Sequence, residues 1–104
     1  MVRVDVSYND SHINKIILKG HSGYDVIGKD IVCSSISSIT ITTVNAIILL
    51  YGDTVISSVY QDDYLTIDIY IHNEVIDKLL ENMISLLKSL EIQYNENIKI
   101  KEVS

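Results

Sequence analysis

Alternation of apolar and polar residues, together with runs of β-branched residues, predicts four strands in the first 71 residues of this chain. Residues 2–7 alternate Val with polar side chains, and after turn residues 9–11 a second strand carries Ile16 and Leu18 and ends at Gly20. Residues 54–60 are rich in β-branched types. After the turn at 61–63, a fourth strand places one apolar row on a single face: Leu65, Ile67, Ile69 and Ile71. The pattern predicts two hairpins.

The period changes to that of a helix after residue 72. Asn73 can cap a helix whose apolar residues recur at spacings of three and four from Val75 to Leu90. Beyond this helix, Ile98 and Ile100 alternate with lysines and suggest a closing strand.

The pattern of residues 30–51 fits both the two-residue period of a strand and the three-to-four-residue period of a helix. Their Ser, Thr, Ile and Val content favours a strand, and residues 39–42 alternate. However, the apolar residues also fall on one helical stripe, Asp30 is a good N-cap, and Gly52 stands where a left-handed C-cap would be. The segment is also too long for a typical strand. We interpret it as a buried helix.

These elements predict one α+β domain over residues 1–104. The order is ββαββα with a last strand, and two helices pack on a mixed or antiparallel sheet.

The composition excludes several classes of protein. Apolar residues make up 47% of the chain, which is typical of a globular domain, and the net charge of -6 with scattered basic residues argues against nucleic-acid binding. An acidic surface favours a basic partner. A single cysteine forms no internal disulfide, residues 1–5 lack the pattern of a signal peptide, and the longest apolar run, 46–51, is too short to span a bilayer. We expect a cytoplasmic protein that does not act at a membrane.

The only cysteine, Cys33, follows His21 by 12 positions across a loop that holds Gly23 and Gly28. An ionised thiol is a nucleophile, and a nearby histidine is its usual proton acceptor. With Asp30 as N-cap, Cys33 falls in the first helical turn, where free backbone N–H groups stabilise a thiolate and can hold an oxyanion. The pattern indicates a thiol enzyme such as a cysteine protease.

Two further residues are candidates for supporting roles in this site. Asp30 could cap the helix or orient His21, and Ser37, one helical turn after Cys33, could form a hydrogen bond within the site.

Structural roles compete with these chemical ones. A lone cysteine in an apolar stretch is most often a buried small hydrophobe, at roughly two to one against catalysis from spacing alone. His12 and His72 are predicted to be surface residues. One cysteine and scattered histidines give no metal-ligand cluster, and no glycine-rich phosphate motif is present, so neither a metal nor a cofactor is expected.

Several blocks together resemble the signature of the ribosomal-processing cysteine proteases, the Prp family. They are Gly20-His21, Gly28, residues 30–33, Ser37, residues 44–48 and residues 94–98, and the spacing from His21 to Cys33 agrees as well. The resemblance implies a cytoplasmic bacterial endopeptidase that works as a homodimer. It further implies that the substrate is the N-terminal extension of large-subunit ribosomal protein twenty-seven, cut after a pair of phenylalanines during ribosome assembly.

By position, the resemblance makes Cys33 the nucleophile and His21 the base, with Asp30 and Ser37 in support. The segment 22–29 would form a loop that closes over the peptide, with five substrate-loop residues: Ser22, Gly23, Val26, Ile27 and Gly28.

Two other functions stay open. The chain could be a non-catalytic module that binds the same ribosomal protein during assembly, with Cys33 merely buried. It could also be a redox sensor, which would need a disulfide between two chains.

Overall fold

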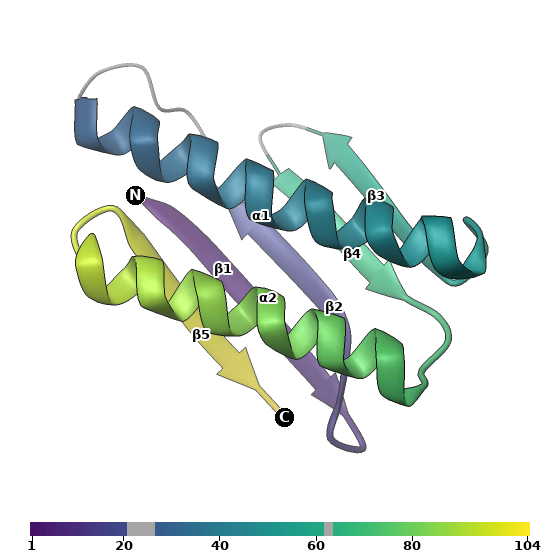
Figure 1. Cartoon of the computed structure of the whole chain (residues 1–104). Helices are drawn as coiled ribbons and strands as arrows, with labels where there is room; N and C mark the ends of the chain where they lie inside the picture. Colours follow the sequence, from purple (N-terminus) through teal and green to yellow (C-terminus); the bar gives the residue numbers. More distant parts are fainter. Residues whose placement is uncertain (21–26, 62–63) are drawn as a thin grey trace.

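The computed structural model describes residues 1–20, 27–61 and 64–104, and the side chains of residues 27–30 lie outside that description. Its elements are β1 (Val2–Asn9), β2 (His12–Lys19), α1 (Ile27–Tyr51), β3 (Ile56–Gln61), β4 (Tyr64–Ile69), α2 (Glu74–Gln93) and β5 (Ile98–Val103) (Figure 1). The predicted α+β class is confirmed, together with the closing strand.

The strands form one mixed sheet in the order β3-β4-β2-β1-β5. Both predicted hairpins are present as antiparallel pairs, and β2 also pairs antiparallel with β4. β5 lies parallel to β1, with Ile98 opposite Val2, because α2 carries the chain back across the sheet. The prediction that Ile71 belongs to the fourth strand is wrong, because β4 ends at Ile69 and Ile71 is exposed beyond it.

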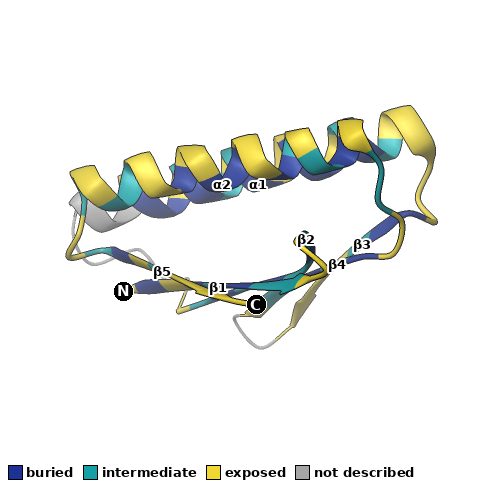
Figure 2. Ribbon diagram, turned by 90° about the horizontal axis from the view of Figure 1, so that it is seen from below, coloured by how far each residue is buried: buried dark blue, intermediate teal, exposed yellow. Residues whose placement is uncertain are grey.

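Both helices cover the same face of the sheet, and the core lies between the two layers (Figure 2). α2 buries the side of the helix on which its apolar residues recur: Ile76, Leu80, Met83, Ile84 and Leu87. Asn73 caps this helix as predicted, since its Oδ1 accepts a hydrogen bond from the N–H of Ile76 at 2.8 Å.

The segment that fitted both periods is helical, as interpreted. α1 buries Val32, Ile36, Val44 and Ile47 in the core. Gly52 follows it with a φ of +89°, and its N–H donates to the carbonyl oxygen of Ile48 at 2.7 Å, so the predicted C-cap is confirmed.

The predicted start of this helix is wrong. α1 begins at Ile27, so Asp30 lies in its first turn rather than at the N-cap, and Ile27 and Gly28 belong to the helix rather than to a loop. An N-cap side chain contributes only about 1 kcal/mol, and neither Ile27 nor Lys29 opposes a helix strongly enough to stop it. Cys33 therefore lies beyond the first turn, past the four N–H groups that a helix start leaves free.

By length and composition alone, the part of α1 from Ile31 to Tyr51 could cross a membrane. A helix that packs in a protein core passes the same test, and α1 packs on the sheet. Its outer face nevertheless exposes Ile31, Ile41 and Leu49, and no charged residue occurs between residues 31 and 51.

Candidate active site

The candidate nucleophile lies where α1 faces the sheet. Cys33 is only 6% exposed and belongs to the buried cluster that also holds its neighbours Val32 and Ile36. β2 ends beneath the N-terminal half of the same helix (Figure 1). The thiol side chain thus lies in the buried core, and a cysteine becomes a nucleophile only when its thiol is ionised. A base close to Cys33 is needed to make it a nucleophile.

The structure describes some of the predicted site residues and not others. His21, Ser22, Gly23 and Val26 lie outside the described residues, as do the side chains of Ile27 and Asp30; for Gly28, only its place in the helix is described. Ser37 is half-buried one turn after Cys33, so the two side chains leave α1 on the same side of the helix, as predicted.

Gly20, the residue before His21, is held tightly at the end of β2. Its φ is +78°, and a Cβ built on it would lie 2.4 Å from the carbonyl oxygen of Met1. Glycine is the residue that tolerates both conditions. The sequence marked Gly20 as the end of a strand and as part of the Gly20-His21 block, but its close approach to the backbone of Met1 becomes visible only in the folded structure.

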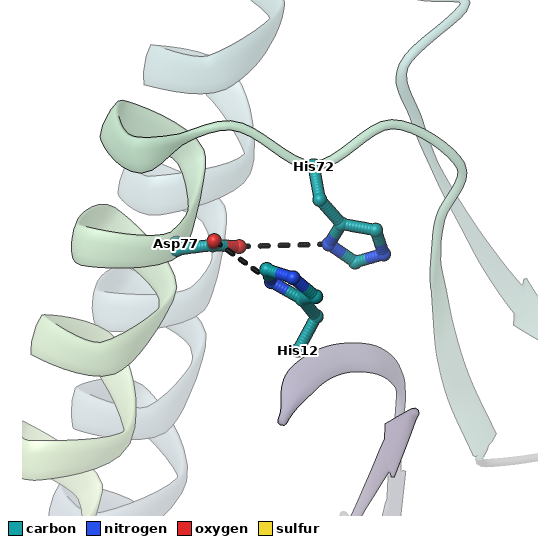
Figure 3. Close-up of side chains that lie close together, drawn as sticks. All are labelled: His12, His72 and Asp77. Atoms are coloured by element: carbon teal, nitrogen blue, oxygen red, sulfur yellow. Dashed lines mark hydrogen bonds and ion pairs between the residues drawn. The ribbon is translucent and has the colours of Figure 1, made fainter. Parts of the chain in front are cut away.

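The structure brings together three side chains that the sequence placed apart. Nδ1 of His12 lies 2.8 Å from Asp77 Oδ2, and Nδ1 of His72 lies 3.5 Å from Asp77 Oδ1 (Figure 3). The two imidazole rings stack with their centroids 4.8 Å apart. The expectation that the histidines form no cluster is therefore wrong for His12 and His72.

A second polar group joins α2 to the sheet edge without using a candidate site residue. Tyr8 on β1 donates to Glu102 on β5, which also pairs with Lys88 on α2. Burial, and then the hydrogen bond to Glu102, raise the pKa of Tyr8 to about 12. The hydrogen bonds from Lys88 and Tyr8 lower the pKa of Glu102.

Comparison with known proteins assigns the chain to a family. A sequence model described as cysteine protease Prp matches residues 1–99. The chain belongs to the Prp family of cysteine proteases. It is 30% identical over 105 residues to the ribosomal processing cysteine protease Prp of Staphylococcus aureus strain Mu50, with 96% of this chain and 97% of the relative covered.

Two solved structures of a Prp protein agree with this assignment. The S. aureus Prp in complex with a substrate peptide is 30% identical, has a TM-score of 0.86 and covers 98% of this chain and 99% of its own. The same protein with a covalently linked product peptide is 31% identical with a TM-score of 0.85 over the same shares. The resemblance drawn from the sequence blocks is thus confirmed, and the enzyme class is that of a cysteine protease of the Prp family.

Proposed function

We propose that this protein is a processing endopeptidase that removes an N-terminal extension from a ribosomal protein, with Cys33 as its nucleophile. One observation carries the proposal: the chain belongs to a family of cysteine proteases, and it has a single cysteine. A cysteine protease uses a thiolate to attack the peptide carbonyl, so only Cys33 is available for that role. The S. aureus relative with a covalently linked product peptide supports a covalent mechanism of this kind.

The reaction follows from these two groups. His21 takes the proton of the Cys33 thiol, and the sulfur attacks the carbonyl carbon of the scissile bond to form a tetrahedral oxyanion. The oxyanion collapses, the C–N bond breaks, and the leaving amine receives the proton from His21. Water, deprotonated by His21, then hydrolyses the thioester, which releases the new carboxylate and restores the thiol.

We assign the substrate as the N-terminal extension of large-subunit ribosomal protein twenty-seven, cut after a Phe-Phe pair. The relative's name, ribosomal processing cysteine protease, supports a ribosomal protein as the target. The charge of this chain, -6, suits a basic substrate, since opposite charge speeds encounter. The reaction would take place in the cytoplasm, during ribosome assembly.

We also propose that the enzyme is a homodimer and that the outer face of α1 forms its interface. Leu49 on this face is 86% exposed, and a helix face with no charge over 21 residues is unusual for a surface in water. Leu49→Lys should shift the protein toward monomer in light scattering. Ile92→Lys, which changes an equally exposed residue on α2, serves as the matched control and should leave the oligomer unchanged. Dissociation by Ile92→Lys alone would place the interface elsewhere.

The test of function is cleavage of the extended ribosomal protein, read by intact mass. The wild-type enzyme should remove one N-terminal peptide that ends in Phe-Phe, and Cys33→Ala should remove none. Val32→Ala is the control, because it empties a neighbouring core position and leaves the thiol in place. A stable complex with both proteins but no cleavage by either would favour the binding module. Cleavage by Cys33→Ala would refute the role of Cys33.

A further inference from the structure

We propose that His12, His72 and Asp77 form a binding site for a divalent transition-metal ion, with zinc as the best match. The site is independent of the proposed protease chemistry. It joins the turn between β1 and β2 to the start of α2, at the opposite end of the molecule from the beginning of α1 (Figure 1).

The donor atoms have the composition of a zinc site. Two imidazole nitrogens and one carboxylate oxygen are common zinc ligands, and three protein ligands with an open fourth position are typical of sites that also bind water. The ligand atoms of the three residues lie within 4.8 Å of one another. The carboxylate of Asp77 faces the two rings from one side, with one oxygen toward each (Figure 3).

The distances are close to those of a formed site. A tetrahedral zinc ion with bonds near 2.0–2.1 Å sets its ligands about 3.3 Å apart. The contact between His72 Nδ1 and Asp77 Oδ1, at 3.5 Å, is close to that value, and the contact of His12 at 2.8 Å is made to the other oxygen of the same carboxylate, Oδ2. Because the ligand atoms lie within 4.8 Å of one another, the widest pair must approach by at most about 1.5 Å to reach this ligand–ligand distance.

Two atoms of the group lack a hydrogen bond. Nδ1 of His72 and Oδ1 of Asp77 are buried and lie 3.5 Å apart, and neither forms a hydrogen bond with a described residue. A buried polar atom without a partner costs free energy, and a metal ion would satisfy both atoms at once. Nδ1 of His12 donates its proton to Asp77, because a carboxylate only accepts. To bind the ion through Nδ1, His12 takes the tautomer that carries its proton on Nε2.

The surroundings admit a hydrated cation. A cavity of about 110 Å³ adjoins the group, and its lining includes a second carboxylate, that of Glu81, one helical turn after Asp77. The three ligand side chains are all partly exposed, between 22% and 43%, so an ion can enter from solvent. The two carboxylates supply negative charge that favours a divalent cation.

The alternative is that the group only ties the hairpin turn to α2. In that case, the hydrogen bond from His12 and the position of Asp77 in the acidic first turn of the helix are its whole contribution. Metal titration separates the two functions.

The experiment is calorimetric titration of Zn²⁺ into the full-length wild-type protein and into Cys33→Ala, which removes the thiol as a competing ligand. Both should bind one ion per chain. His72→Gln and Asp77→Asn should weaken binding at least about tenfold, since even outer-shell changes cost that much. Asp68→Asn, on β4 and paired with Lys15, is the matched carboxylate control and should bind like wild type.

Three results would overturn the site: no binding by either protein, unchanged binding by His72→Gln, or half an ion per chain, which would place the ion between two copies. Circular dichroism confirms that each variant is folded. If His72→Gln does not fold, wild-type protein loaded with Co²⁺ decides the question. A tetrahedral spectrum that is the same in Cys33→Ala supports the site, and a thiolate charge-transfer band that vanishes in Cys33→Ala refutes it. Saturating zinc should also raise the Tm of the wild-type protein by about 10 °C.

Discussion

Replacement of Gly20 by Ala tests the close backbone approach beside the candidate active site. Gly20 and Gly52 both have a positive φ, +78° and +89°, but only Gly20 has a neighbour in the way. A Cβ at Gly20 would lie 2.4 Å from the carbonyl oxygen of Met1, whereas one at Gly52 would have nothing within 4 Å. Gly52→Ala is therefore a matched control, because it introduces an alanine at a positive φ without a steric clash.

The magnitudes follow from these two environments. A left-handed conformation costs an alanine about 1–2 kcal/mol, and the stiffer unfolded chain returns about 0.4–1 kcal/mol. Gly52→Ala should thus lower the free energy of unfolding by about 1 kcal/mol. Gly20→Ala should lose a further 1–3 kcal/mol or so from the clash. The N–H of Val2 bonds to the carbonyl oxygen of Asn97 at 2.8 Å, which restrains the strand that would have to move.

Urea unfolding followed by circular dichroism measures this difference. With a slope of about 1–2 kcal/mol per molar urea, the midpoint of Gly20→Ala should fall about 0.5–3 M below that of Gly52→Ala. We also expect Gly20→Ala to lower the rate of peptide cleavage, since His21 is the next residue, and Gly52→Ala to leave it unchanged. Equal midpoints for the two variants would refute the reasoning, because they would show that Met1 moves aside at no cost.

Three further predictions concern stability. Asn73→Ala should lower the free energy of unfolding by about 1 kcal/mol, because it removes the cap of α2, and Asn73→Asp should restore most of it in the same urea assay. Leu80→Ala should cost about 2–5 kcal/mol, whereas Leu86→Ala, on the exposed side of the same helix, should cost well under 1 kcal/mol, and similar losses would contradict the assigned core. Folding raises the pKa of Tyr8 from 10.0 to about 12. The contribution of Tyr8 to the free energy of unfolding is therefore complete below pH 10 and is lost as the pH rises toward 12. Tyr8→Phe should flatten that decline in thermal melts, and an unchanged decline would exclude Tyr8 as its source.

The start of α1 shows where local signals mislead. Asp30 has the right chemistry for a cap, but the capping preference is small and the residues before it accept helical geometry, so the helix continues back to Ile27. The family resemblance did not depend on this detail, because it rested on residue identities and on the spacing between His21 and Cys33. The assignment to a cysteine protease family is confirmed, and the argument for a thiolate at the first helical turn is wrong.

The histidine group shows the opposite case. His12 and Asp77 are 65 residues apart, and no local pattern relates them. They meet because β2 begins at the same end of the sheet at which the connection from β4 enters α2. Only the strand order brings these two turns together.

The sequence by itself determined the elements of this protein, since periods of two and of three to four residues reflect which side of a strand or helix is buried. It also determined the ends of elements where a side chain or a glycine acts on its own neighbours, as Asn73 and Gly52 do. Tertiary structure alone decided the parallel pairing of β5 with β1, the burial of Cys33, the contact at Gly20 and the meeting of His12, His72 and Asp77. Each of these depends on segments distant in sequence that become neighbours only when the sheet and helices pack together, and local propensities carry no information about that packing.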